Sequence, residues 1–212
     1  MYETEGIILL GICSNCGNHE WDKEVTGDVI TCPKCGYKWH FKKKPIYFLT
    51  GCSGIGKTTT AQKLQEITED YVVLDADMFY NIMSPQNEEK NYAMVEQVFS
   101  LTKNINQADK TVVWTMAGNI DKLHHTYGAR FFSDIKVLAL TADAETIRQR
   151  MIEGRGITDE GWIKGSIDYN EYFRTHTKLS DTEFETLDCS NDVPEKVAEN
   201  VLEWLKNNTY TY

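Results

Sequence analysis

A glycine-rich octapeptide in the first third of the chain has the residue types and spacing of a phosphate-binding loop. The pattern G-x-x-x-x-G-K-[ST] is matched at every fixed position by Gly51-Cys52-Ser53-Gly54-Ile55-Gly56-Lys57-Thr58. Glycines let backbone N–H groups approach phosphate oxygens, and a following helix would point the positive end of its dipole at them. We expect Lys57 to reach the β- and γ-phosphates of ATP, Thr58 to ligate Mg²⁺, and Thr59 to complete this nucleotide site. A glycine-rich turn without a ligand is the alternative, but the motif lies between a strand pattern and a helix pattern, as a phosphate loop does.

Two carboxylates one residue apart follow the next apolar segment, Tyr71–Leu74. In an extended segment Asp75 and Asp77 would point the same way, toward the carboxyl edge of a sheet, where ligands bind. We assign the Mg²⁺ shell to Asp75, which is nearer the strand, and proton acceptance from a substrate hydroxyl to Asp77. Helix capping is the simpler alternative, because aspartate is a favoured N-cap residue.

Four cysteines near the N-terminus have the spacing of a zinc site. Cys13 and Cys16 form one C-x-x-C pair, Cys32 and Cys35 form another, and fifteen residues separate the pairs. Four thiolates complete a tetrahedral shell, so the Zn²⁺ would be structural and would supply folding energy to a segment too short to bury much core. Two redox-active pairs are the alternative, but the βαβ pattern typical of such proteins is missing around them.

The segments that must position these residues alternate between strand and helix from residue 45 onward. Apolar runs predict strands at 46–49, 71–74, 111–114, 135–140 and 184–187, and helical periodicity predicts helices at 59–69, 88–104, 144–153 and 194–205. This alternation predicts an α/β fold with a parallel sheet covered on both faces. We expect a zinc ribbon at 1–44 and a nucleotide-binding domain at 45–212, with a lid around 150–170.

The charge distribution and the short length of the apolar runs exclude several classes of protein. Residues 1–45 contain six lysines and six acidic residues, so the remaining 167 residues carry the whole formal charge of −10. A domain this acidic lacks the broad basic surface that nucleic-acid binding requires, although Lys42-Lys43-Lys44 is a local exception, which we interpret as a solvated linker. No apolar run is long enough to cross a membrane or to form a signal peptide, so we expect a cytoplasmic protein.

Residues from about 45 to 205 resemble the small P-loop kinases, which include shikimate, gluconate, adenylylsulfate and nucleoside or nucleotide kinases. Besides the phosphate loop, the resemblance rests on Leu74-Asp75-Ala76-Asp77, on Leu140–Arg150 with Arg155 beyond it, and on Leu187-Asp188-Cys189-Ser190-Asn191 before a Pro-Glu helix start. It implies the strand order 2-3-1-4-5 of the P-loop NTPase fold, with helices on both sides of five parallel strands.

The resemblance also implies roles for two further parts of the chain, and the sequence departs from the family pattern in a third. Arg150 and Arg155 would stabilise charge on the transferred phosphoryl group, although surface pairs with Glu145 or Glu153 are the alternative. Ser190 and Asn191 would lie beside adenine. The third strand lacks the aspartate that many P-loop enzymes place at its end to steady Mg²⁺.

These features predict an ATP-dependent kinase whose acceptor is a small molecule, with a nucleoside or nucleotide as the first candidate. One alternative is a polynucleotide 5′-hydroxyl kinase that holds its strand with the zinc ribbon. Another is a nucleotide-dependent switch with little turnover. The sequence leaves the acceptor, the oligomeric state and the role of the ribbon open.

Overall fold

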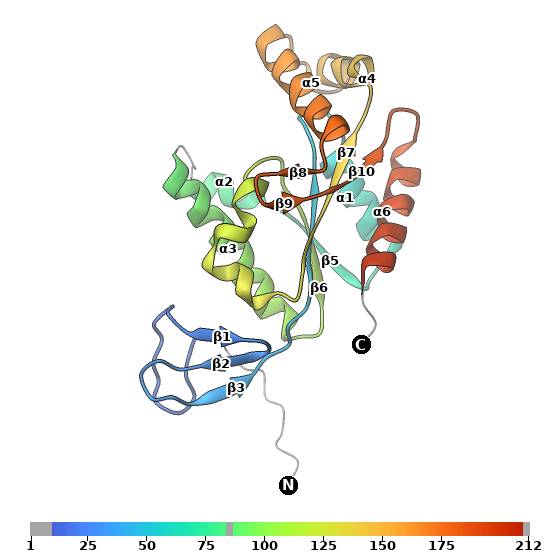
Figure 1. Ribbon diagram of the computed structural model, residues 1–212. Helices are drawn as coiled ribbons and strands as arrows, with labels where there is room; N and C mark the ends of the chain where they lie inside the picture. The colour runs from blue at the N-terminus through green and yellow to red at the C-terminus, as the bar shows by residue number, and fades with distance from the viewer. Residues whose placement is uncertain (1–9, 84–86, 210–212) are drawn as a thin grey trace.

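The computed structural model describes residues 10–83 and 87–209; the ends of the two expected domains, residues 1–9 and 210–212, lie outside this range. A five-stranded parallel sheet organises most of the chain (Figure 1). Its strands are β4 (Ile46–Thr50), β5 (Tyr71–Asp75), β6 (Thr111–Thr115), β7 (Ile135–Thr141) and β10 (Glu185–Asp188). They lie in the order β5-β6-β4-β7-β10, which confirms the order 2-3-1-4-5.

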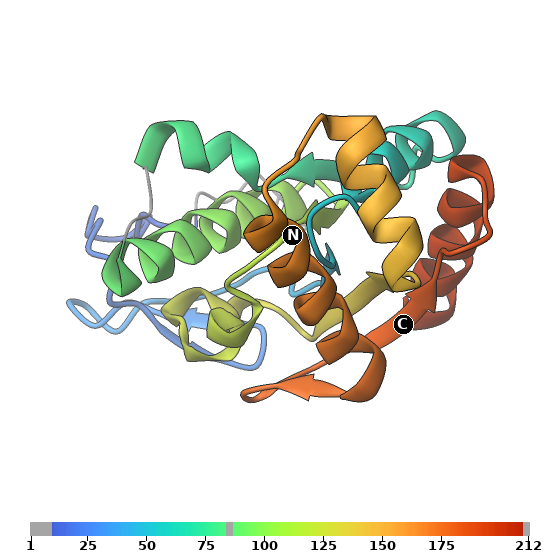
Figure 2. The same cartoon turned by 90° about the horizontal axis from the view of Figure 1, so that it is seen from above.

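Helices cover both faces of this sheet, as expected for strands that are apolar on both sides. Figure 2 shows the sheet from above, between its two helical layers. One layer contains α1 (Lys57–Ile67) and α6 (Pro194–Asn208); the other contains α3 (Glu88–Asn106) and two 3₁₀ helices, Ile120–His125 and Tyr127–Phe131. Helix α5 (Glu160–Thr175) contributes to the buried clusters of both layers, with Ile163 in the first and Phe173 in the second. Alternate residues of β4 serve the two layers, because Tyr47 and Leu49 pack with α1 and α6 while Ile46 and Phe48 pack with α3.

Several helical segments differ from those predicted. The expected helix at 144–153 ends as α4 at Gln149 and continues as one π-helical turn, Arg150–Gly154. Helix α2 (Asp77–Met83), helix α5 and the hairpin β8 (Lys178–Leu179) with β9 (Thr182–Glu183) were not predicted. Helix α3 begins as expected because the Asn87 side chain accepts a hydrogen bond from the Lys90 N–H at 2.9 Å.

The cysteine-rich segment forms a small antiparallel sheet of its own. Strands β1 (Glu24–Thr26), β2 (Val29–Thr31) and β3 (Lys38–His40) pair in that order. Figure 1 shows them at the end of the large sheet where β4 begins, opposite the end near α4 and α5. We call residues 10–44 the ribbon.

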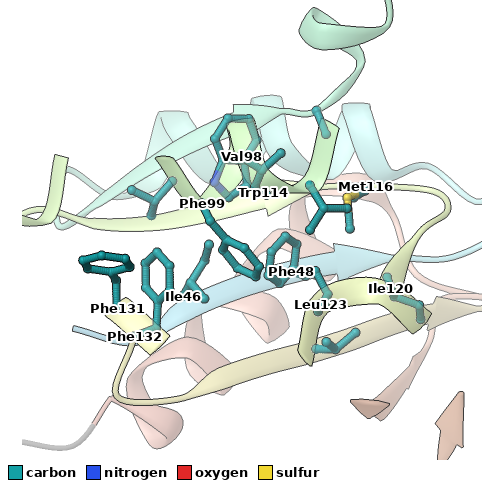
Figure 3. Close-up of a cluster of buried hydrophobic side chains, with 14 of the residues drawn as sticks. Ile46, Phe48, Val98, Phe99, Trp114, Met116, Ile120, Leu123, Phe131 and Phe132 are labelled. Atoms are coloured by element: carbon teal, nitrogen blue, oxygen red, sulfur yellow. The ribbon is translucent and has the colours of Figure 1, made fainter. Parts of the chain in front are cut away.

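The ribbon and the large domain share one hydrophobic core. Ile30, Trp39 and Phe41 of the ribbon belong to the same buried cluster as Phe48 and Phe131. Figure 3 shows the part of this cluster contributed by the sheet, α3 and the 3₁₀ helices. The expected division at residue 44 therefore remains a proposal about chain organisation, and the two parts are not joined by a free linker.

The three consecutive lysines that we interpreted as a solvated linker make specific contacts. Lys42 and Lys44 form ion pairs with Asp109, and Lys43 donates to the Gly27 carbonyl at 3.0 Å. The contacts with Asp109 tie the ribbon to the turn that follows α3, and the Lys43 contact lies within the ribbon, so this basic run is engaged by the protein itself. No helix among the described residues has the length and apolar character needed to cross a membrane.

Candidate nucleotide and acceptor site

The octapeptide forms a loop between β4 and α1, at the carboxyl edge of the sheet. Three of its glycines have positive φ angles, 137° at Gly51, 79° at Gly54 and 107° at Gly56, which glycine alone adopts readily. A Cβ at Gly51 would lie 2.6 Å from the Leu140 carbonyl oxygen, and one at Gly54 would lie 2.7 Å from Met151 Cγ. The loop therefore has the conformation and the close packing that glycines were expected to provide.

Lys57 is the first residue of α1, and its side chain folds back over the loop. Its Nζ donates to the carbonyl oxygens of Gly51 and Cys52, both at 2.9 Å. Burial lowers the pKa of Lys57, while the groups of Cys52, Asp77 and Asp75 act in the opposite direction. An ammonium group held by neutral carbonyls inside this loop is well placed to exchange them for phosphate oxygens.

A cavity of about 610 Å³ opens beside the loop. It is lined by residues 53–60 of the loop and α1, and by residues from the ends of several strands and from the lid: Asp75, Asp77, Thr115, Met116, Ala117, Arg150, Gly154, Arg155, Cys189, Asp192, Pro194 and Val197. The predicted residues Lys57, Thr58, Thr59, Asp75, Asp77, Arg150 and Arg155 therefore share one cavity. Its size is in the range of small-molecule sites.

The two aspartates lie together, but not in the extended segment that we expected. Asp75 ends β5, whereas Asp77 is the first residue of α2, and the Asp77 N–H donates to Asp75 Oδ1 at 3.0 Å. Asp75 thus accepts the first N–H of α2 from two residues before the helix, and its other oxygen accepts from Thr58 Oγ1 at 3.4 Å. Thr58 and Asp75 together offer the oxygen ligands that Mg²⁺ prefers.

Asp77 has an electrostatic environment suited to accepting a proton. Desolvation and then the Asp75 carboxylate raise the pKa of Asp77, while Lys57 and Arg155 act against this shift. A carboxylate with a raised pKa is a better base than an ordinary surface aspartate. Asp168, an acidic residue of α5 that could also be considered as a base, pairs with Lys164 at 2.5 Å and does not line the cavity.

The two candidate arginines are held differently. Arg150 is half-buried and donates to the Ile55 carbonyl at 3.1 Å and to the Cys189 carbonyl at 3.0 Å. It therefore connects the phosphate loop with the loop after β10. Arg155 is exposed, and its guanidinium lies 5.9 Å from the ring centre of Trp162. Neither arginine forms an ion pair with Glu145 or Glu153 among the described contacts.

The loop after β10 meets the cavity with different residues from those predicted. Ser190 is turned into the loop itself, where its Oγ donates to Asp188 at 2.6 Å and accepts from the Asp143 N–H at 2.9 Å. The lining comes instead from Cys189 and Asp192, with Pro194 and Val197 from the first turn of α6. Neither Ser190 nor Asn191 lines the cavity.

Sequence reasoning also missed the contribution of the third strand. Thr115, Met116 and Ala117 line the cavity where β6 ends. These residues carry no charge, so their side chains gave no signal of a site. Only their position could have indicated it, because the carboxyl ends of neighbouring parallel strands meet at one edge of the sheet.

The four cysteines of the ribbon converge as predicted from their spacing. All four Sγ atoms lie within 4.8 Å of one another, with 3.7 Å between Cys13 and Cys35 and 3.7 Å between Cys16 and Cys32. A tetrahedral Zn²⁺ with Zn–S bonds of about 2.3 Å requires S–S separations of about 3.8 Å. The cluster therefore fits a closed, structural zinc site.

The backbone around the cysteines supports this interpretation. Gly17 and Gly36 follow the two pairs with φ angles of 68° and 74°, and their N–H groups donate to the Cys13 and Cys32 carbonyls at 2.8 Å. Desolvation opposes ionisation of Cys32, but hydrogen bonds from the Cys35 and Lys34 backbone lower its pKa to about 6. A backbone hydrogen bond from Asn18 lowers the pKa of Cys16, but desolvation and the three neighbouring cysteines outweigh it and raise this pKa to about 12. Thiolates are the form in which cysteine binds metal.

Fold and site together define a P-loop nucleotide-binding protein built like the small-molecule kinases. The family model described as an AAA domain matches residues 48–172, more than half of the chain, and the protein belongs to this family. No curated protein sequence matches the chain.

Solved structures with the same fold include several kinases. An unliganded sugar kinase from Janibacter sp. HTCC2649 is 19% identical, with a TM-score of 0.58 over 77% of this chain and 95% of its own. A gluconokinase from Sinorhizobium meliloti 1021 is 14% identical, with a TM-score of 0.55 over 80% and 94%. A shikimate kinase from Acinetobacter baumannii in complex with shikimate is 19% identical, with a TM-score of 0.52 over 81% and 98%. At these identities the likeness is one of fold.

Proposed function

We propose that this protein is an ATP-dependent kinase that transfers the γ-phosphate to a hydroxyl group of a small molecule. The observation that carries the proposal is the single cavity in which the phosphate loop, Asp77 and Arg155 meet. A nucleotide switch would need the loop and the metal ligands, but it has no acceptor hydroxyl and so no need for a potential base in the same cavity.

Each residue of the cavity has a role in this proposal. Bound ATP–Mg²⁺ supplies the phosphoryl group. Lys57 and the backbone N–H groups of residues 53–58 hold its phosphates, and Thr58 with Asp75 orients the metal shell. Asp77 positions the acceptor hydroxyl and takes its proton, and Arg155 stabilises the charge of the transferred group. Arg150 fixes the loop on which these groups depend.

The same proposal covers the organisation of the chain. Residues 10–44 would be a zinc ribbon, with Cys13, Cys16, Cys32 and Cys35 as ligands, and residues 45–212 would be the kinase domain. Residues 150–170 contain Arg150, Arg155 and the first part of α5, and we propose that they act as the lid of the site.

A nucleoside or nucleotide is the first acceptor to test, and sugars and hydroxy acids follow, because the sugar kinase, gluconokinase and shikimate kinase named above share the fold. A polynucleotide held by the ribbon is less well supported. The ribbon lies where β4 begins, whereas the phosphate loop follows the opposite end of that strand (Figure 1). The lysines between them are also engaged by Asp109 and Gly27.

Acceptor-dependent release of ADP tests the proposal, with Lys57→Ala as the diagnostic variant. The Lys57 ammonium matters more as negative charge develops on the departing phosphoryl group than when ATP first binds. We expect turnover to fall by roughly 10²-fold or more while ATP affinity changes far less. ATP binding without ADP release against the whole acceptor panel would instead support the switch.

A further inference from the structure

The hydroxyl group of Thr115 is buried at the edge of the cavity without a hydrogen-bond partner. Thr115 is the last residue of β6, and it is 2% exposed. Its Oγ1 is shielded from solvent and neither donates nor accepts a hydrogen bond within the described part of the chain. Burial of a hydroxyl without a partner is unfavourable, so such a group in a native protein calls for an explanation.

The backbone holds Thr115 next to Asp75. Thr115 is the register partner of Asp75 on β5 and of Leu49 on β4. Its carbonyl accepts from the Ala76 N–H, and the following N–H, of Met116, donates to the Leu49 carbonyl, both at 3.0 Å. Residues paired across neighbouring strands project their side chains from the same face, and such strands lie about 4.8 Å apart. The side chains of Asp75 and Thr115 therefore lie side by side.

The face from which they project is the one that carries the phosphate loop. Val113, two residues before Thr115 on β6, packs in the buried cluster of α1 and α6, so Thr115 is on the same face. Thr115 lines the cavity together with Thr58 and Asp75. Thr58 Oγ1 donates to Asp75 at 3.4 Å. Three oxygen-bearing side chains therefore meet at this edge of the sheet.

This group of oxygens fits a Mg²⁺ ion with its bound water. Mg²⁺ at phosphate sites is held by one or two protein oxygens and keeps several waters. Residues that hydrogen-bond to the ligands of a metal tune its affinity without touching the ion. A threonine hydroxyl both donates and accepts, and rotation about its Cα–Cβ bond exchanges Oγ1 with the methyl group. The Thr115 hydroxyl can therefore turn to a polar ligand in the cavity that it lines.

We propose that Thr115 is a metal-positioning residue, whose hydroxyl hydrogen-bonds to a water of the Mg²⁺ shell beside Thr58 and Asp75. This role gives the buried hydroxyl the partner that the protein itself does not supply. It rests on the proposed function, because it requires ATP–Mg²⁺ in the cavity, but it does not depend on the transfer of phosphate. The simpler alternative is that threonine is present only as a residue that suits a strand.

Thr50 offers a matched control on the neighbouring strand. It ends β4, is fully buried, and its Oγ1 also has no hydrogen-bond partner among the described residues. Thr50 is on the same face as Phe48, which packs with α3, and it does not line the cavity. Thr50→Val therefore removes an equivalent hydroxyl on the face away from the candidate metal ligands.

The affinity of a metal probe tests the proposal. Mn²⁺, a paramagnetic substitute for Mg²⁺, is titrated into the complex of the protein with β,γ-imido-ATP and followed by EPR, with the protein in excess over the nucleotide. Thr115→Val should raise the Kd of Mn²⁺ by about tenfold or more, the usual effect of losing an outer-shell partner. The affinity for β,γ-imido-ATP without added Mn²⁺ or Mg²⁺ should not change. Thr115→Ser, which keeps the hydroxyl, and Thr50→Val should bind Mn²⁺ as the parent protein does.

Thermal stability separates this role from a structural one. Because Oγ1 has no partner in the protein, Thr115→Val should leave the Tm without nucleotide unchanged or raise it. Thr115→Ala provides a second variant without the hydroxyl and should show the same loss of Mn²⁺ affinity.

Three results would overturn the assignment of Thr115 and leave the nucleotide site in place: unchanged Mn²⁺ affinity in Thr115→Val and Thr115→Ala, an equal loss in Thr115→Ser, or an equal loss in Thr50→Val. Failure of the parent protein to bind β,γ-imido-ATP would overturn both this role and the proposed function.

Discussion

Removing the metal from the ribbon should destabilise the whole protein, because the ribbon is part of the main core. Phe41 is 5% exposed and packs against Phe131 with ring centres 5.7 Å apart, and Trp21 contacts Tyr127 at 5.3 Å. Gln107 makes two hydrogen bonds to the Lys42 backbone, at 2.9 and 3.1 Å. A ribbon that unfolds without its metal would lose all of these contacts at once.

These contacts set the expected size of the effect. Burial of Phe41 contributes about 2 kcal/mol, each aromatic pair about 1 kcal/mol, and each hydrogen bond about 1 kcal/mol. The total is an upper value near 6 kcal/mol, because an unfolded ribbon would keep part of its burial. In a protein of this length, 1 kcal/mol shifts Tm by about 2–4 °C, so we expect a decrease of up to about 12–24 °C.

Calorimetry with and without a chelator measures this shift, and metal analysis establishes the stoichiometry of one Zn²⁺ per chain. Cys32→Ser should reproduce the effect of the chelator. Phe41→Ala should keep the metal but lower stability by about 3–5 kcal/mol, the usual cost of truncating a buried phenylalanine. Chelation should then cost less in Phe41→Ala than in the parent protein, since part of the contact is already lost.

Two outcomes would refute this reasoning. Purified protein without metal, unaffected by Cys32→Ser, would exclude the zinc site itself. A metal-loaded protein whose main unfolding transition moves by less than about 2 °C on chelation would show that the ribbon is an independent unit.

Three further predictions concern the cavity. Asp77→Asn keeps the shape of the side chain but cannot take a proton, so the rate of phosphate transfer should fall by about 10²–10⁴-fold with ATP affinity unchanged. A turnover close to that of the parent protein would reject Asp77 as the base. Asp75→Asn should raise the Mg²⁺ concentration needed for activity. It should also move the acidic limb of the pH–rate profile to lower pH, because the Asp75 charge helps to raise the pKa of Asp77; an unmoved limb would assign it to another group. Arg155→Ala should lower kcat without changing Tm. Arg150→Ala should lower both Tm and ATP affinity, because only Arg150 bridges two loops. If both variants showed the same changes in calorimetry and kinetics, this distinction would be rejected.

The sheet and the phosphate loop were predictable because local sequence determines them. Each central strand is a short apolar run, and the glycines of residues 51–56 occupy backbone conformations that other residues adopt at a cost. The convergence of the four cysteines was predictable from their spacing, because a closed metal site allows only certain spacings between its ligand residues. These features needed no knowledge of distant contacts.

The features that were missed depend on packing between residues far apart in the sequence, or on which of two neighbouring loop residues faces the cavity. Helix α5 contains Gly161 and Gly165, which weaken its helical signal, and it is stabilised by Phe173, buried against Phe184. In the loop after β10, Cys189 and Asp192 line the cavity while Ser190 turns inward. The backbone conformation of this loop determines which of its residues face the cavity, and no periodic pattern in the sequence indicates that conformation.

One segment, which contains the two 3₁₀ helices, contacts the ribbon at one end of the large sheet and begins beside the cavity at the other end. The amino-acid composition could not indicate this connection. Glu96 of α3 accepts hydrogen bonds from the Tyr127 and Gly128 N–H groups, and the Tyr127 hydroxyl donates to the Lys23 carbonyl in the ribbon. At its other end, the segment that contains these 3₁₀ helices begins directly after Ala117 and carries Asn119. A ribbon that holds Tyr127 in place therefore restrains the same segment, which begins beside the cavity-lining residues Met116 and Ala117. Loss of the metal should consequently weaken acceptor binding before it weakens ATP binding, since the phosphate loop packs against β7 and α4 instead.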